Sequence, residues 1–404
     1  MKKRIDLSQL KVGMYMEVDV KESTGASKSV LLLGKGVLIA SENQIRRLQE
    51  AGLRQVVIDT SKGLDVEGGT QVDAPAPSAP RTPEFKEPPP GRKEHFRDEI
   101  KIARKIRGAS IRVVKDFMFD AAKGRSIDTK KVRLAAKTLT GSVFRNVDAL
   151  LSLTTLKDYS EHTYTHSVNV CILTLAIAHA SGVSEKEAEV IGVGGLLHDI
   201  GKSKIPLAIL DKPGPLTPEE RRVVMSHPLF SEEILLKIGN IAPEAIAIAV
   251  QHHEKVNGTG YPRGLTGDQM HPFGSMAAVA DVYDALTSPR PYKPGLPPHI
   301  ALRHVFDGRG VEFETKVVDV FVRNLGIYPV GSFVKLSTGE MGLVLQTNPQ
   351  DSLKPKVGII FSRFGKRRKT LYVVDLFHAS REERRAIVEA DDPKKYDVDV
   401  EDYL

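Results

Sequence analysis

The spacing of apolar residues predicts that most of this chain is helical. From Phe96 the apolar positions recur every three or four residues, first through Phe117 and then, in a second run, through Val143. We expect residues 95–150 to form a connector of two helices, either an antiparallel hairpin or a dimerisation coil. The same spacing continues through residues 151–327, which predicts an all-helical bundle.

Shorter runs at the start of the chain predict a small α+β domain over residues 1–63. Apolar and polar side chains alternate near Tyr15–Val20 and Ser29–Ile39, as they do in half-buried strands. Ser41, followed three residues later by Gln44, matches a capping box and opens a short helix. The segment has no cluster of catalytic residue types, so we interpret it as a regulatory or accessory domain.

Composition and turn residues set the remaining boundaries. Residues 64–94 are rich in proline, mixed with Ala, Ser and Glu, which favours an extended linker over a packed core. Residues 328–378 predict a small β-rich domain, and residues 379–404 are expected to be a charged tail. The expected strands of the β-rich domain are Ser332–Leu336, Met341–Leu345, Val357–Phe361 and Thr370–Val374.

The overall composition is that of a soluble globular protein, with 41% hydrophobic and 27% charged residues among 404. No apolar run approaches the ~20 residues of a membrane helix and no secretory signal is present, so we expect a cytoplasmic protein without membrane insertion. The single cysteine, Cys171, fits a reducing compartment. The net charge of +7 suits an anionic partner, but helix-turn-helix and zinc-finger spacings do not appear, so we expect no DNA binding. We interpret the basic runs Lys101–Lys137 and Arg363–Lys369 as solvated faces.

The candidate chemistry centres on a histidine–aspartate pair at the end of an apolar run. His198 and Asp199 place two kinds of metal ligand side by side, and Gly201 and Lys202 follow with a turn and a cation. Such pairs are common by chance, but this one has further ligand types on both sides of it in the sequence. They are His162, His166, His227, His252, His253 and Asp281.

The spacing of these residues favours two metal ions over one. His162 and His166 are four residues apart, so their side chains share one helix face. The adjacent His252 and His253 point about 100° apart on a helix and would serve different ions. Asp199 has two carboxylate oxygens and is the natural bridge. Imidazoles with carboxylates suit divalent Mn, Fe, Co, Ni or Zn, and a bridged pair of such ions is a standard solution for phosphoester hydrolysis.

The order of the motifs resembles the HD-GYP family, bacterial cyclic di-GMP phosphodiesterases of the HD superfamily. The resemblance covers residues ~155–325, and Leu10–Tyr15 with Val57–Thr60 also resembles the small N-terminal domain of one HD-GYP subgroup. It rests on His198-Asp199-Ile200-Gly201-Lys202, His227-Pro228, His252-His253-Glu254, Gly258-Thr259-Gly260-Tyr261-Pro262, Asp281-Val282-Tyr283-Asp284 and Arg290-Pro291-Tyr292-Lys293.

The resemblance implies a role for each residue of these motifs. Asp199 would bridge the metals, and Lys202 would stabilise charge at the scissile phosphate. Tyr261 would line the substrate pocket, and Arg290 and Lys293 would contact the substrate phosphates. Glu254 and Asp284 would orient ligands from behind. The implied metal ligands are His166, His198, Asp199, His227, His252, His253 and Asp281, with two or three divalent ions, Fe or Mn, as cofactors.

One position departs from part of the family. Members with a third metal carry a glutamate where this chain has His162, and an imidazole cannot bridge two ions as a carboxylate does. We therefore favour two metals over three, with His162 as an eighth ligand left open. The number of metals bears on whether the product is linear pGpG or GMP.

The implied activity is hydrolysis of the second messenger cyclic di-GMP by attack of a metal-activated hydroxide. The main alternative is a cyclic di-GMP receptor with weak turnover, and a phosphohydrolase of another nucleotide is a third reading. A homodimer and signalling-protein partners stay open.

Overall fold

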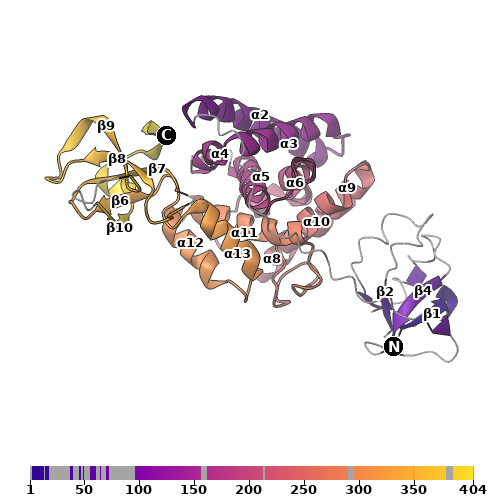
Figure 1. Ribbon diagram of the computed structural model, residues 1–404. Coiled ribbons are helices and arrows are strands. Elements are labelled where there is room, and N and C mark those ends of the chain that lie inside the picture. Colours follow the sequence, from indigo (N-terminus) through magenta and orange to yellow (C-terminus); the bar gives the residue numbers. More distant parts are fainter. Residues whose placement is uncertain are drawn as a thin grey trace. The chain divides into compact units, whose positions relative to one another are not determined.

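The computed structural model describes residues 2–12, 14–17, 37–39, 45–46, 49, 55–60, 64, 70–71, 96–155, 162–212, 214–289, 295–348, 350–378 and 385–403. The chain divides into two compact units, residues 1–82 and 83–404, and Figure 1 draws both. Among the described helices, none combines the length and apolar character needed to cross a bilayer.

The first unit contains a five-stranded sheet in the order β3-β2-β4-β1-β5, with its described strand pairs antiparallel. Its strands are β1 (Lys2–Asp6), β2 (Tyr15–Glu17), β3 (Val37–Leu38), β4 (Gln55–Asp59) and β5 (Thr70–Gln71). Met14, Met16 and Ile58 are among the residues buried in its core. The expected capping residues Ser41 and Gln44 lie outside the described residues.

One boundary of this unit differs from the sequence prediction. Residues 64–94 were expected to be linker throughout, but β5 lies within them and pairs with β1 through Thr70 and Arg4. Strand pairing uses backbone groups, so a short strand can add to an edge without an apolar side-chain pattern.

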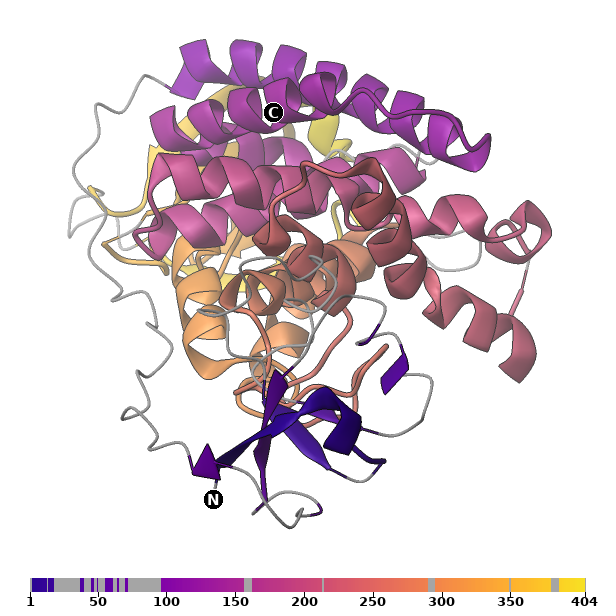
Figure 2. The ribbon, with the colours of Figure 1, turned by 90° about the vertical axis from the view of Figure 1, so that its right-hand side faces the viewer.

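The second unit is mainly helical and confirms the expected fold class. Its helices are α2 (Phe96–Ala122), α3 (Thr129–Arg145), α4 (Val147–Thr154), α5 (His162–Ala180), α6 (Glu185–Leu197), α7 (Leu207–Leu210), α8 (Pro218–Met225), α9 (His227–Ile238), α10 (Pro243–Gln251), α11 (Pro272–Thr287), α12 (Pro298–Asp307) and α13 (Thr315–Leu325). Helices α2 and α3 pack on each other and on α5, and α3 also packs on α6 (Figure 2). The expected helical pair is therefore a hairpin that forms part of the bundle.

Glycines on α6 let this helix approach its neighbours closely. A Cβ added at Gly195 would lie 2.8 Å from Cys171 Cα on α5, and one at Gly194 would lie 2.9 Å from Ala245 O on α10. Because both obstacles are backbone atoms, larger residues would push these helices apart. The close packing places the end of α6, where His198 follows, between α5 and α10.

A five-stranded antiparallel sheet in the order β10-β6-β7-β8-β9 follows the helices, and two 3-10 helices, Pro393–Tyr396 and Val400–Asp402, come after it. Its strands are β6 (Phe333–Leu336), β7 (Met341–Gln346), β8 (Lys356–Phe361), β9 (Arg367–Asp375) and β10 (Ile387–Asp391). The four predicted strands are present. The prediction of a tail from residue 379 is wrong for β10, which pairs with β6, and for Tyr396 and Val398, which pack near Phe333. On β10, Glu389 is exposed and the half-buried Asp391 pairs with Lys395, so these charges do not oppose strand pairing.

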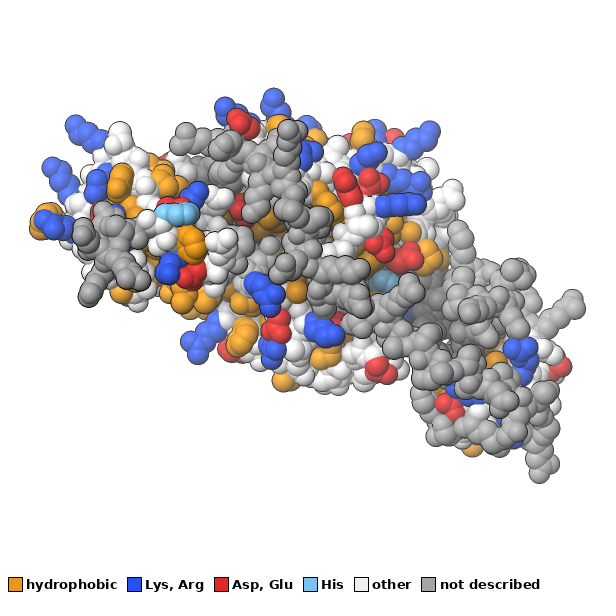
Figure 3. All heavy atoms as spheres, viewed as in Figure 1, with side chains coloured by type: hydrophobic (Ala, Val, Ile, Leu, Met, Phe, Trp, Pro, Cys, Tyr) orange, Lys and Arg blue, Asp and Glu red, His pale blue; other side chains and the backbone are white. Residues whose placement is uncertain are grey.

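The basic runs have the surface character expected of solvated faces. Lys101, Arg104 and Lys105 on α2 are all exposed. On the face shown in Figure 3, Lys and Arg side chains are interspersed with Asp and Glu over the helical unit.

Candidate metal centre

The turn after α6 places His198 and Asp199 against the start of α9. Ser231 on α9 holds this turn, because its hydroxyl donates to His198 O and accepts from Gly201 N, both at 2.9 Å. A Cβ at Gly201 would lie only 2.0 Å from His227 O, so no other residue allows this approach without moving the backbone. Sequence reasoning missed Ser231, since a single hydroxyl on a helix carries no recognisable pattern.

Asp199 lies at the centre of the site, and its two oxygens face different histidines. Its Oδ1 is 3.2 Å from His227 Nε2 and 3.8 Å from His252 Nε2. Its Oδ2 is 3.3 Å from His198 Nε2 and 3.6 Å from His166 Nε2. The carboxylate is 1% exposed, so it lies between two buried groups of imidazoles.

A second carboxylate, Asp281 on α11, joins the two groups on another side. Its Oδ1 is 3.0 Å from His166 Nε2, and its Oδ2 is 3.4 Å from His253 Nδ1. Lys202 completes the cluster, with its Nζ 2.5 Å from Asp199 Oδ2. The structure thus brings seven of the expected metal-ligand residues and Lys202 together from α5, α9, α11 and the residues that follow α6 and α10.

Backbone carbonyls fix the orientation of three of the imidazoles. The Nδ1 atoms of His198, His227 and His252 lie 2.8, 2.7 and 3.0 Å from carbonyl oxygens three residues earlier in the chain. A carbonyl only accepts, so each Nδ1 carries the proton and each Nε2 of the neutral ring keeps a lone pair. All three lone pairs are directed toward Asp199, which is the arrangement of histidines that bind metals.

Asp284, one turn after Asp281 on α11, orients His166 in the same way. Its Oδ2 accepts from His166 Nδ1 at 2.8 Å, which leaves Nε2 facing Asp281. This contact is the one expected for Asp284 from the sequence.

The electrostatics of the site separate the histidines into two kinds. Burial acts to lower the pKa of His166, but hydrogen bonds to Asp281 and Asp284 outweigh it and raise the pKa to about 9. Burial, with the charges of neighbouring histidines, holds the pKa of His252 well below its usual value, and burial lowers that of His253 to about 3. These two rings are neutral at pH 7 and free to act as ligands.

The carboxylates of the site are ionised despite their burial. Burial acts to raise the pKa of Asp199, but Lys202 and His198 outweigh it and hold that pKa well below the usual range. Burial likewise acts to raise the pKa of Asp281, but the charge that His253 carries at low pH, together with the hydrogen bond and charge of His166, lowers it. Anionic oxygens beside the neutral rings of His252 and His253 form a donor set for a divalent cation, and His166 joins them once it loses its proton.

Unsatisfied atoms show that the site fits metal ions. Within the described part of the chain, His198 Nε2 and Asp199 Oδ1 are buried and make no hydrogen bond. His227 Nε2 and His252 Nε2 are 3.1 Å apart, and with both Nδ1 atoms protonated this contact is between two lone pairs. Two nitrogens that bind one ion at right angles, each about 2.1 Å from it, lie about 3.0 Å apart. Two groups of residues have ligand atoms within 4.8 Å of one another: His166, His198 and Asp199, and His227, His252 and His253.

The loop after His253 covers one side of the centre. The ring centroids of Tyr261 and His253 are 4.6 Å apart. The backbone N–H of Tyr261 also donates to His253 O at 3.1 Å. A Cβ at Gly260 would lie 2.3 Å from Lys255 N, which explains the glycine before Tyr261. Glu254 was expected to orient a metal ligand; its carboxylate instead accepts from the backbone N–H groups of Arg263 and Leu265 and so holds this loop.

Three expected residues are not placed at the centre by the structure. Arg290 and Lys293 lie outside the described residues. His162 is the first residue of α5, one turn before His166, and only its backbone is described.

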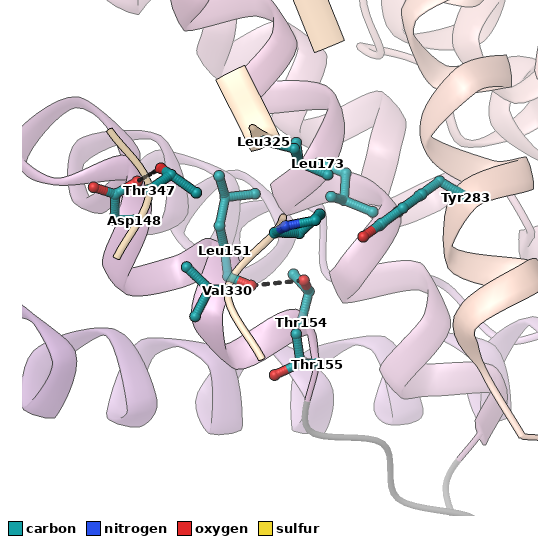
Figure 4. A pocket seen from close by; sticks show the side chains of 10 residues that line it. Asp148, Leu151, Thr154, Thr155, Leu173, Tyr283, Leu325, Val330 and Thr347 are labelled. Carbon is teal, nitrogen blue, oxygen red and sulfur yellow. Dashed lines mark hydrogen bonds between the residues drawn. The ribbon is translucent and has the colours of Figure 1, made fainter. Parts of the chain in front are cut away.

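A small cavity lies elsewhere in the helical unit, between α4, α5, α11 and α13 (Figure 4). Its lining includes Leu151, Tyr283, Val330 and Thr347, and its volume is about 20 Å³. A volume of that size holds about one water molecule, so this cavity is too small for a nucleotide.

Comparison with known proteins matches three families along the chain. The family described as HD domain matches residues 152–317, a domain of unknown function matches residues 2–132, and a KOW domain associated with HD domain matches residues 333–398. The chain is 37% identical over 385 residues to a cyclic di-GMP phosphodiesterase of Pseudomonas aeruginosa, covering 95% of this chain and 91% of that protein.

Two further relatives each match about a third of this chain. A cyclic di-GMP phosphodiesterase response regulator of Xanthomonas campestris pv. campestris is 40% identical over 148 residues, 36% of this chain and 39% of that protein. A 3'3'-cGAMP-specific phosphodiesterase of Vibrio cholerae is 41% identical over 138 residues, 34% of this chain and 30% of that protein.

The helical fold and the histidine–aspartate centre define an HD-domain protein of a metal-dependent class. Because the chain also matches a cyclic di-GMP phosphodiesterase over nearly its whole length, it belongs to the HD-GYP family of HD-domain proteins.

Proposed function

We propose that this protein is a metal-dependent phosphodiesterase that hydrolyses cyclic di-GMP. The observation that carries the proposal is the position of Asp199, whose two oxygens face two separate groups of imidazoles. When bound, a bridged pair of divalent ions lowers the pKa of water and stabilises charge on the attacking and leaving oxygens of a phosphodiester. The names of the relatives supply the substrate class, a 3',3'-linked cyclic dinucleotide.

The residues of the centre divide between the two ions in this proposal. His166, His198 and Asp281 would hold one ion, His227, His252 and His253 would hold the other, and Asp199 would contribute one oxygen to each. The proposed metal is Fe or Mn, as the resemblance to the HD-GYP family implies, and mixed imidazole and carboxylate ligands suit both. A third ion at His162 stays open.

The residues around the ions bind and orient the substrate. Lys202, which is 23% exposed and pairs with Asp199, turns to a phosphate oxygen as substrate enters. Tyr261 packs against a guanine base or the ribose, and Arg290 and Lys293 neutralise the phosphates. Water adds to phosphorus, the bond to the 3′ oxygen breaks, and that oxygen leaves with a proton, which gives linear pGpG. Cleavage of the second diester gives GMP.

Domain roles follow from the same proposal. Residues 151–327 form the catalytic domain, and residues 95–150 complete its bundle. Residues 1–63 and the β-rich region from residue 328 serve as accessory domains, and the protein acts in the cytoplasm.

The test is product chromatography with two substrates. Anaerobically purified protein loaded with Mn²⁺ or Fe²⁺ is incubated with cyclic di-GMP or with 3'3'-cGAMP, beside Asp199→Asn and the exposed-site control Asp211→Asn. We expect pGpG or GMP from the wild type and the control, and loss of product in Asp199→Asn. Turnover of 3'3'-cGAMP alone would contradict the substrate, and binding without turnover would make the protein a receptor.

A further inference from the structure

A buried asparagine on α5 lies behind the metal centre. Asn169 is 0% exposed. Its Nδ2 donates to Asp284 Oδ1 at 3.0 Å and to Thr154 O at 3.5 Å. Its Oδ1 accepts from Nε and Nη2 of Arg107 on α2, at 3.4 and 3.3 Å. One amide therefore links α2, α4 and α11 to α5.

The partners of Asn169 allow its amide only one orientation. A guanidinium only donates, so Arg107 requires the amide oxygen on its side. The Asp284 carboxylate accepts from His166 and requires the amide NH₂ on its side. If the amide were turned over, both contacts would become repulsive. Arg107 thus decides which end of the amide faces Asp284.

We propose that Asn169 and Arg107 are positioning residues for the metal centre and act through Asp284 on His166. Asp284 is 0% exposed; its Oδ2 accepts from His166 Nδ1 and from the Ser288 hydroxyl, and its Oδ1 accepts from Asn169 Nδ2. Without the amide donor, Oδ1 of this buried carboxylate loses that partner, and the carboxylate is held less firmly in the orientation that faces the His166 ring. His166 then no longer holds its Nε2 toward Asp281. This inference rests on the proposed function only in taking His166 as a metal ligand.

The proposal gives a role to part of a domain of unknown function. Arg107 lies outside residues 152–317, which match the HD domain, and inside residues 2–132, which match the domain of unknown function. Helix α2 packs on α4 and α5, so the Arg107 side chain reaches Asn169 behind the metal centre directly. A truncation that begins at residue 152 would remove this support.

The first test is the metal affinity of Asn169→Asp, which keeps the shape of the side chain and replaces the donor NH₂ by an oxygen. Free Mn²⁺ is followed by electron paramagnetic resonance during titration of the metal-free full-length chain. The matched control is Asn324→Asp, because Asn324 Nδ2 donates to Ala176 O at 3.3 Å, near the far end of α5. We expect one Mn²⁺ site to weaken about 10–100-fold in Asn169→Asp and both sites to stay unchanged in the control.

A second pair of variants tests the orientation argument and replaces the first if Asn169→Asp does not fold. Arg107→Met removes the donor to the amide oxygen, and Arg107→Lys keeps one. We expect Arg107→Met to weaken the same Mn²⁺ site and Arg107→Lys to restore most of its affinity. Wild-type affinity at both sites in Asn169→Asp or Arg107→Met, or equal weakening of both sites, would overturn the proposal. Wild-type protein that binds two Mn²⁺ but leaves cyclic di-GMP intact would contradict the proposed function and not this comparison of affinities.

Discussion

Replacing Gly201 by alanine is expected to separate α9 from the turn after α6 that contains His198 and Asp199. The added Cβ would lie 2.0 Å from His227 O and 2.5 Å from Ser231 N, and both are backbone atoms that cannot rotate away. Ordinary contact begins at 3.4 Å, so the two segments must separate by about 1.4 Å. Overpacking of this kind costs about 1–3 kcal/mol of stability. The same movement separates Asp199 Oδ1 from His227 Nε2, which are 3.2 Å apart. A shift of about 1 Å in a catalytic site can lower the rate roughly 100-fold.

The assay compares Gly201→Ala with Gly108→Ala, which adds the same methyl group. A Cβ at Gly108 on α2 meets only Arg112 Nη1, at 3.9 Å, and alanine is about 1 kcal/mol better than glycine inside a helix. Urea unfolding by circular dichroism, metal content and the initial rate at saturating Mn²⁺ are measured for both. We expect Gly201→Ala to unfold at lower urea, to lose metal and to turn over about 100-fold more slowly, whereas Gly108→Ala is as active as the wild type. A Gly201→Ala protein with wild-type unfolding and full metal content would refute the packing argument.

Three further predictions concern the loop, the protons and the metals. Glu254→Gln should raise KM for cyclic di-GMP about tenfold with metal content unchanged, because each lost charge-assisted bond to the loop at Arg263 and Leu265 is worth about 1.5–3 kcal/mol; a fall in metal content with KM unchanged would contradict it. Metal binding at pH 7 should release a proton, because His166 with a pKa of about 9 is protonated in the metal-free protein; the release should vanish above pH 9. Calorimetry in buffers of different ionisation enthalpy measures the number of protons released. Heats of binding that do not depend on the buffer would refute this prediction. Chelation should lower the thermal midpoint and abolish turnover, since it leaves His198 Nε2 and Asp199 Oδ1 buried without partners, and added Mn²⁺ should restore both; an unchanged midpoint would contradict this assignment.

Local signals made much of the fold predictable. Ser184 and Glu187 form a capping box before α6, and Thr217 with Pro218 begins α8; both are local patterns of the sequence. β5 and β10 were missed because short edge strands form through backbone pairing and need no apolar alternation.

The ligands of the centre were predictable because metal binding requires particular residue types, and these recur in a fixed order. The groups that position them were not. Ser231 acts on a turn about 30 residues earlier in the chain, and Asn169 contacts residues 62 and 115 positions away. Asn169 stands between two valines in an apolar run, so only the packed structure shows that its amide has polar partners.

The most direct test of the account is the metal content of Asp199→Asn measured together with its turnover. An amide has one oxygen and no negative charge, so it cannot bridge two ions as a carboxylate does. The account predicts at least two divalent ions per wild-type chain with hydrolysis of cyclic di-GMP, and fewer than two with no product in Asp199→Asn. Two ions and wild-type turnover in Asp199→Asn would contradict a bridging role for Asp199.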